Sequence, residues 1–320
     1  MFFNNEEEVM MSERDRTIGG DCGAEERKQI LQLGEDALRK ALEWALDEVG
    51  LDRLEAQRVI EAGGVLAEDI KLALATKLVK LGRARYANEE EKPGLAYFHG
   101  SSVEPLSKQI AILCKVFGLD GQYALAYAEK LPELPPLAEG WFAVPRWQAV
   151  AENYGQALAK LLELFGRSEL IDCYWKLETW MSDDTFDEKH LCPHVHTAQY
   201  FRQIEQAQSG NILVVPAQLG LRHRGRSVRH SRELFSSIEF GLGSFHSGSI
   251  LLTHPHRMFR GNLGLDCPGD EYSPRADGQF YKTPTFYMTS DLDLQFNSHR
   301  NDRVGSRFGS ASGFLPSDLC

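Results

Sequence analysis

The chain has 320 residues, 42% of them hydrophobic and 25% charged, and its formal net charge is -11. A chain of this length buries a sizeable core without disulfide staples, and its six scattered cysteines, with no CxxC pair, fit a reducing compartment. No window approaches eighteen apolar residues, and the first residues lack the regions of a secretory signal. We therefore expect a soluble, cytoplasmic protein with no membrane partner.

The first half of the chain has the periodicity of helices. Residues 1–24 are acidic and poor in large apolar side chains, which predicts a flexible leader. Across 25–165, apolar residues recur every three or four positions between glycine and proline breakers, the pattern of amphipathic helices. This helical region is expected to contain helices over 24–49, 51–62, 65–81, 105–117, 122–131 and 147–165.

Residues 51–81 resemble a helix, turn and helix of the kind that reads DNA. The second of these helices opens with Glu68 and Asp69, whose carboxylates would repel phosphates. We therefore expect the helical region to be a packing surface, or the contact for a protein partner or a second copy of the chain.

Past residue 166 the apolar period changes from near 3.6 to 2, which is typical of strands. Asp277 and Gly278 add the signal of a hairpin turn. Residues 166–320 are thus predicted to form a β-rich domain, either a sandwich or a small barrel, in an α+β protein. The strands are expected at 171–180, 211–216, 248–254, 285–290 and 291–297.

The side chains suited to chemistry lie mainly in this second half, which holds thirteen arginines, three lysines and nine of the ten histidines. Arginine is the cation best suited to bidentate recognition of phosphate. The densest stretch is GLRHRGRSVRHSR at 220–232. It contains seven candidate ligand-binding residues: Arg222, Arg224, Arg226, Arg229, Arg232, His223 and His230.

This arginine segment predicts a binding protein for a phosphate-bearing ligand, single-stranded nucleic acid or a nucleotide. Phe235, Phe240 and Phe245 follow it and could stack on unpaired bases. The alternative is structural: the same arginines could pair with acids of this chain, or lie at a subunit interface of an assembly protein. The sequence leaves both interpretations open, because basic runs serve either purpose.

A second candidate is the stretch KHLCPHVHTAQ, in which histidine or cysteine occupies every second position from His190 to His196. An extended backbone would project these groups to one side, and zinc or iron accepts such ligands. His194 and His196, completed by His254 and His256, would make the protein a metal-dependent enzyme. The alternative is a set of polar histidines at a strand edge.

The glycines of EFGLGSFHSGSILLTH do not form a phosphate loop. His246 stands where a dinucleotide fingerprint needs glycine, and Ser249 where a triphosphate loop needs lysine. The strand expected at 248–254 would also leave no helix N-terminus for a phosphate.

The stretch LDCPGDEY places Asp266, Asp270 and Glu271 close together in sequence. Such carboxylates bind hard cations or divide general acid and base roles, and a solvated turn explains them equally well. No nucleophile elbow occurs, since Ala311 stands at the nucleophile position of GSASG.

Overall fold

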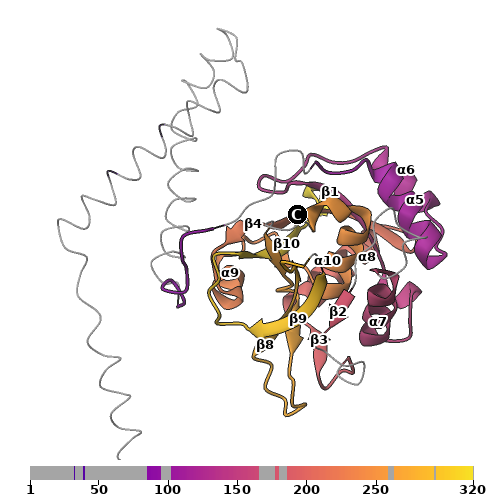
Figure 1. Ribbon diagram of the computed structural model, residues 1–320. Coiled ribbons are helices and arrows are strands. Elements are labelled where there is room, and N and C mark those ends of the chain that lie inside the picture. The colour runs from indigo at the N-terminus through magenta and orange to yellow at the C-terminus, as the bar shows by residue number, and fades with distance from the viewer. Residues whose placement is uncertain are drawn as a thin grey trace, which may run out of the picture. The chain divides into compact units, whose positions relative to one another are not determined.

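The computed structural model describes residues 85–94, 102–165, 177–179, 186–258, 263–291 and 293–319, together with Gln32 and Arg39. The chain divides into two compact units, Met1–Thr76 and Lys77–Cys320, and nearly all described residues belong to the second (Figure 1). The leader expected at 1–24 and the helices expected between 24 and 81 lie outside the described residues, apart from Gln32 and Arg39, which are helical.

The second unit has α-helices close to two of the expected positions. The predictions at 105–117 and 122–131 are confirmed as α5 and α6. The helix expected at 147–165 is divided, because Asn153 Oδ1 accepts a hydrogen bond from the backbone N–H of Gln156 at 2.9 Å and starts a new helix. The described helices are α5 (Leu106–Phe117), α6 (Gln122–Ala128), α7 (Tyr154–Phe165), α8 (Val195–Ala207), α9 (Val228–Leu234) and α10 (Ser244–Thr253), with 3-10 turns η1 (Trp147–Ala149), η3 (Pro255–Arg257) and η4 (Ser317–Leu319). None of these helices is long and apolar enough to cross a membrane.

The strands pair into one mixed sheet with the main order β1-β4-β10-β6-β8-β7-β3, while β9 joins β8 and β2, and β5 joins β10. The pairs β10/β6 and β2/β9 are parallel and the others are antiparallel. The strands are β1 (Gly140–Pro145), β2 (Leu177–Thr179), β3 (Leu191–Pro193), β4 (Ile212–Arg224), β5 (Glu239–Gly241), β6 (Gly264–Asp266), β7 (Asp270–Tyr272), β8 (Lys282–Met288), β9 (Leu294–Arg300) and β10 (Phe308–Phe314). This mixed sheet confirms the α+β class with a β-rich part, and it is not closed into a barrel.

The strands expected near 211, 285 and 291 correspond to β4, β8 and β9. Of the strand expected at 171–180, only β2 lies within the described residues. The turn at Asp277 and Gly278 is confirmed: it lies between the antiparallel β7 and β8, and Gly278 has the positive φ of +77° that favours glycine.

The strand expected at 248–254 is wrong, because these residues belong to α10 and its C-cap. Every residue of α10 is buried, from Ser244 to Thr253. A helix that is buried all round has no polar face to mark a period of 3.6. Its apolar run SILLT therefore reads as a strand when the sequence is taken alone.

The main core lies on one face of the sheet, under α7 and α10. Alternation along the strands supplies it: Phe142 and Val144 of β1, and Leu213 and Val215 of β4, all point into this core. At the far end of the sheet Leu265, Phe286 and Phe296 face the same side and pair in register across β6, β8 and β9. β1 lies inside the range expected to be helical, so the helical and β-rich segments described share one core.

The opposite face of the sheet is divided between an apolar and a polar part. Ala143, Ile212 and Val214 of β1 and β4 pack there against Ile110 and Leu113 of α5, with α6 alongside. Toward β10, β6, β8 and β9 the side chains on this face are polar or aromatic. This second part of the face holds the larger of the cavities described below.

Candidate functional site

The arginine segment forms a corner of the structure: the end of β4, a turn and α9. Gly225 makes the turn with φ +78°, and a Cβ added there would lie 2.4 Å from the carbonyl oxygen of Glu91. The backbone of Gly225 accepts a hydrogen bond from Glu91, and Ser227 donates one to Glu89. The segment therefore packs directly against residues 85–94.

Two of the predicted arginines are neutralised by this neighbouring segment. Arg226 donates to both carboxylate oxygens of Glu90, at 2.9 and 3.1 Å. Arg229 pairs with Glu89 and lies 4.3 Å from the ring centroid of Tyr86. The guanidinium of Arg229 holds the pKa of the Glu89 carboxyl below its usual range. Among the predicted histidines, His230 is buried and contacts the carbonyl oxygen of Tyr86.

Arg232 is also engaged within the chain. It donates to the carbonyl oxygens of Pro268 and Asp270, each at 2.9 Å, and lies 3.6 Å from Glu271. Arg224 differs from the other four, since it is exposed and forms no ion pair with any residue that the structure describes. Of the rings proposed for base stacking, Phe240 and Phe245 are fully buried, so they offer no face to a ligand.

Arg222 and His223 meet a buried carboxylate, Glu239. Arg222 Nε lies 3.1 Å from both carboxylate oxygens, and His223 Nε2 lies 2.8 Å from one of them. Burial raises the pKa of Glu239, but hydrogen bonds from His223 and Ser312 and the charge of Arg222 outweigh it and lower the pKa to about 2. Burial lowers the pKa of His223, so a neutral imidazole donates to an ionised Glu239 that has Arg222 as counterion.

The predicted metal ligands lie in two pairs. His194 is the N-cap of α8, where its Nδ1 accepts from the backbone N–H of His196 at 3.3 Å. His254 is buried, its Nε2 accepts from the backbone N–H of Glu104 at 3.0 Å, and His256 lies beside it. Burial lowers the pKa of His194 and of His254 to about 4. Within the described ranges, no three His, Cys, Asp or Glu side chains gather to hold a metal ion.

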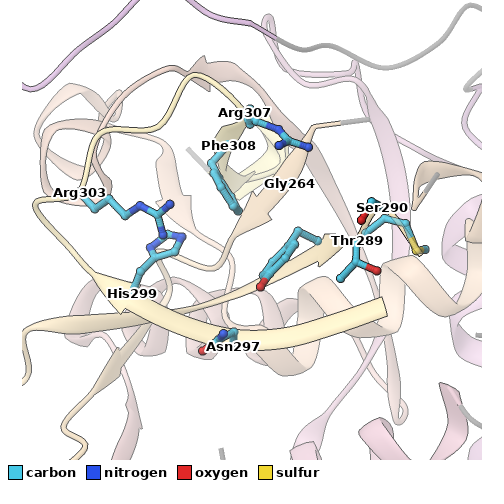
Figure 2. Close-up of a pocket in the computed structure, with 10 residues that line it drawn as sticks. Gly264, Thr289, Ser290, Asn297, His299, Arg303, Arg307 and Phe308 are labelled. Carbon is cyan, nitrogen blue, oxygen red and sulfur yellow. The ribbon is translucent and has the colours of Figure 1, made fainter. Parts of the chain in front are cut away.

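A further cavity lies elsewhere, on the polar part of the sheet (Figure 2). Its volume is about 630 Å3, within the range of about 300–1,000 Å3 that is usual for small-ligand sites. Strands β8, β9 and β10 and the loops after β8 and before β10 surround it. The lining residues are Gly264, Tyr287, Met288, Thr289, Ser290, Asn297, His299, Arg303, Arg307 and Phe308.

Strand alternation explains why these side chains share one face. Phe296 of β9 enters the core, so the next residue, Asn297, points to the opposite face. His299 stands two residues after Asn297 and therefore points to the same side as Asn297. In β8, Phe286 enters the core and Tyr287 turns to the cavity. The register of β8 and β9 thus places one row of polar and aromatic side chains on the open face.

Arg303 and Arg307 carry the positive charge of this cavity. Both are exposed, and neither forms an ion pair within the part of the chain that the structure describes. The guanidinium carbon of Arg303 lies 5.5 Å from the ring centroid of Phe308. The rings of Tyr287 and Phe308 are half-buried and meet edge to face at 5.8 Å. Two cations and two aromatic rings therefore face one open space.

Beneath the cavity lies a buried polar row. His299 Nε2 is 3.1 Å from Asp266 Oδ1, but neither atom makes a well-aligned hydrogen bond. The hydroxyls of Thr283 and Ser310 are also buried and have no hydrogen-bond partner among the residues that the structure describes. Thr283 pairs with His299 and Ser310 with Asp266 in the sheet register, so these groups lie on adjacent strands. Unsatisfied buried polar groups are uncommon, and their concentration here marks a polar floor.

Local sequence patterns do not identify Arg303, Arg307, His299, Tyr287 or Phe308 as site residues. One local signal was present: in DLDLQFNSHR the polar Gln295 and Asn297 alternate with the apolar Leu294 and Phe296, which indicates a strand with one polar face. Arg303 and Arg307 lie outside that strand, so only the tertiary structure brings them to the same face.

Comparison with family models, curated proteins and solved structures finds no match to this chain, and the cavity is therefore the basis for a functional assignment.

Proposed function

We propose that the protein binds single-stranded nucleic acid in the cavity between β8, β9 and β10, with Arg303 and Arg307 as the phosphate contacts. The observation that carries the proposal is that one open cavity holds two half-buried aromatic rings and two arginines that form no ion pair with any described residue. The arginines of the 220–232 segment fit phosphate less well, because four of the five are engaged with groups of the same chain.

The aromatic rings favour nucleic acid over an isolated phosphate. Bases stack on aromatic side chains, and this contact tolerates any base sequence. Tyr287 and Phe308 supply such rings, while Asn297, Thr289 and Ser290 supply amide and hydroxyl groups for base edges. A sheet face that presents aromatic rings beside arginines is a common way to hold unpaired bases.

The net charge of -11 sets the expected strength of binding. At long range the acidic chain repels a polyanion, but at about 0.1 M salt charges beyond about 10 Å are screened. Attraction by Arg303 and Arg307 therefore acts at contact range. We expect weak binding that is strongest at low salt.

A salt titration tests the proposal. Fluorescent ten-nucleotide RNA and DNA are titrated between about 20 and 200 mM salt, and the slope of log affinity against log salt is compared between variants. Arg303→Ala/Arg307→Ala removes two phosphate contacts, so its slope is expected to be shallower by about 1.4. Arg224→Ala/Arg275→Ala is the matched control, because it removes the same charge from two exposed positions outside the cavity lining.

Equal slopes for the two double variants would contradict the assignment to the cavity. A shallower slope in the control alone would return the site to the 220–232 segment, in which Arg224 lies. Absence of binding by the wild type at the lowest salt would exclude the proposed function altogether.

A further inference from the structure

A second, smaller cavity is bordered by η1, α7, α8 and α10 and shares no lining residue with the first. Its volume is about 200 Å3. Trp147 of η1, Tyr154 of α7, Phe201 of α8 and His246 of α10 present their rings to it. Four of the ten lining residues thus contribute an aromatic ring.

These rings are held in place by contacts outside the cavity. Trp147 and Tyr154 meet edge to face, with centroids 6.2 Å apart and planes at 87°. The hydroxyl of Tyr154 bonds the carboxylate of the fully buried Asp270 at 2.8 Å, which fixes the ring. Phe201 stacks on His246 with centroids 3.8 Å apart and planes at 12°. The walls are thus formed before any ligand enters, which lowers the cost of binding.

His246 is a buried polar group of the cavity. It is only 5% exposed, and neither ring nitrogen has a hydrogen-bond partner in the described chain. Of the two nitrogens only Nδ1 is fully enclosed, which leaves Nε2 as the nitrogen that reaches a molecule in the cavity. Burial lowers the pKa of His246 to about 3, so the imidazole is neutral near pH 7. Its free ring nitrogen can donate or accept one hydrogen bond, depending on the tautomer, and suits an uncharged group.

The charges at this cavity do not select an ion. Arg202 and Glu205 both line it, so the two signs are present together. Glu205 is in addition 3.8 Å from Arg146 and accepts a hydrogen bond from Gln148 at 3.4 Å. A charged ligand would thus gain little net electrostatic attraction from the cavity, and it would lose the free energy of its hydration.

We propose that this second cavity binds a small uncharged molecule made of one aromatic ring with one hydrogen-bonding substituent, of the phenol class, and that His246 bonds the substituent. The volume fits, because an apolar protein cavity of about 150 Å3 binds benzene and 200 Å3 leaves room for a substituent. The ring packs against Trp147, Tyr154 and Phe201. This site is independent of the nucleic-acid cavity, so either proposal stands or fails alone.

Calorimetric titration of the full chain with phenol and with toluene tests the proposal. The two probes have similar shape and differ in the hydroxyl that His246 recognises. His246→Phe keeps the ring that stacks on Phe201 and removes the hydrogen bond. Phenol affinity is expected to fall about tenfold, the effect of one lost hydrogen bond, while toluene affinity changes less than about twofold.

Ala198→Trp provides a second variant at a lining position that is partly exposed, where a large side chain fills the cavity and leaves the core intact. Affinity for both probes is expected to fall at least about tenfold, with an unchanged thermal unfolding curve. Failure of the wild type to bind phenol at about 10 mM, or binding that persists in Ala198→Trp, would overturn the proposal. An equal loss of phenol and toluene in a folded His246→Phe variant would contradict the role of His246.

Discussion

The Nε2 atom of His299 on β9 lies 3.1 Å from Oδ1 of Asp266 on β6, although β8 runs between these two strands. The side chain of His299 reaches across β8, and its ring meets the edge of Phe308 at 5.1 Å. Gly264 makes room for this arrangement, because a Cβ there would lie 2.7 Å from the ring of Phe308. The floor of the cavity is thus built from side chains of β6, β8, β9 and β10.

The aromatic contact predicts a change in affinity without a change in salt slope. Tyr287→Leu removes a ring from the cavity wall and alters no charge. Loss of one stacked base costs about 1–3 kcal/mol, so affinity for single-stranded nucleic acid is expected to fall by about 5- to 150-fold. The same fluorescence titration measures both quantities. A shallower slope in this variant would mean that the cavity had rearranged and would count against direct stacking.

Removal of the Asp266 carboxylate is expected to strengthen the binding of single-stranded nucleic acid, whereas removal of the Tyr287 ring weakens it. The carboxylate is a buried negative group under a site that we assign to phosphate. Asp266→Asn removes its repulsion, and at a separation of about 10 Å in a partly shielded medium this is worth about threefold in affinity. We expect tighter binding at low salt and little difference at high salt. Weaker binding in this variant would show that Asp266 acts instead by holding His299.

Glu239 predicts a loss of stability in acid. Its pKa is lowered from 4.5 to about 2, so its contribution is fully present above pH 4.5 and is lost as the pH falls toward 2. The contribution is at most about 3 kcal/mol. Urea unfolding of the wild type and of Glu239→Gln between pH 6 and 3 measures this contribution. The difference in free energy of unfolding between the two proteins should narrow as the pH falls. A gap independent of pH would exclude an ionised Glu239.

Asp270 predicts the reverse dependence. Burial raises its pKa from 3.8 to about 6, despite hydrogen bonds from Ser244 and Tyr154. The folded chain therefore binds the proton of Asp270 more tightly than the unfolded chain does. This proton's contribution to the free energy of unfolding is fully present below pH 3.8 and is lost as the pH rises through 6. The amount is about 3 kcal/mol.

Asp270→Asn keeps an oxygen acceptor for Tyr154 and removes the titration. Relative to the wild type, its free energy of unfolding should improve by up to about 3 kcal/mol between pH 4 and 6.5. Parallel pH profiles for the two proteins would show that Asp270 does not titrate in this range.

The sequence by itself determined the elements whose pattern is local. The apolar spacing of Ile110 and Leu113 identifies α5, and the alternation around Phe286 and Phe296 identifies β8 and β9, because half-buried elements carry their period in the chain. It also determined that arginines and histidines concentrate in the second half. It did not identify α10, whose complete burial removes the polar face that marks a helix.

Only the tertiary structure decided which arginines remain available to a ligand. Arg229 meets Glu89 across 140 positions of sequence, and Arg222 meets Glu239 only because β4 and β5 both pair with β10. Arg303 and Arg307 stand among fewer basic neighbours, yet the topology gives them a cavity, and they form no ion pair within the residues that the structure describes. The partners of a charge are set by which strands pair, and strand pairing is a long-range property that a local pattern does not contain.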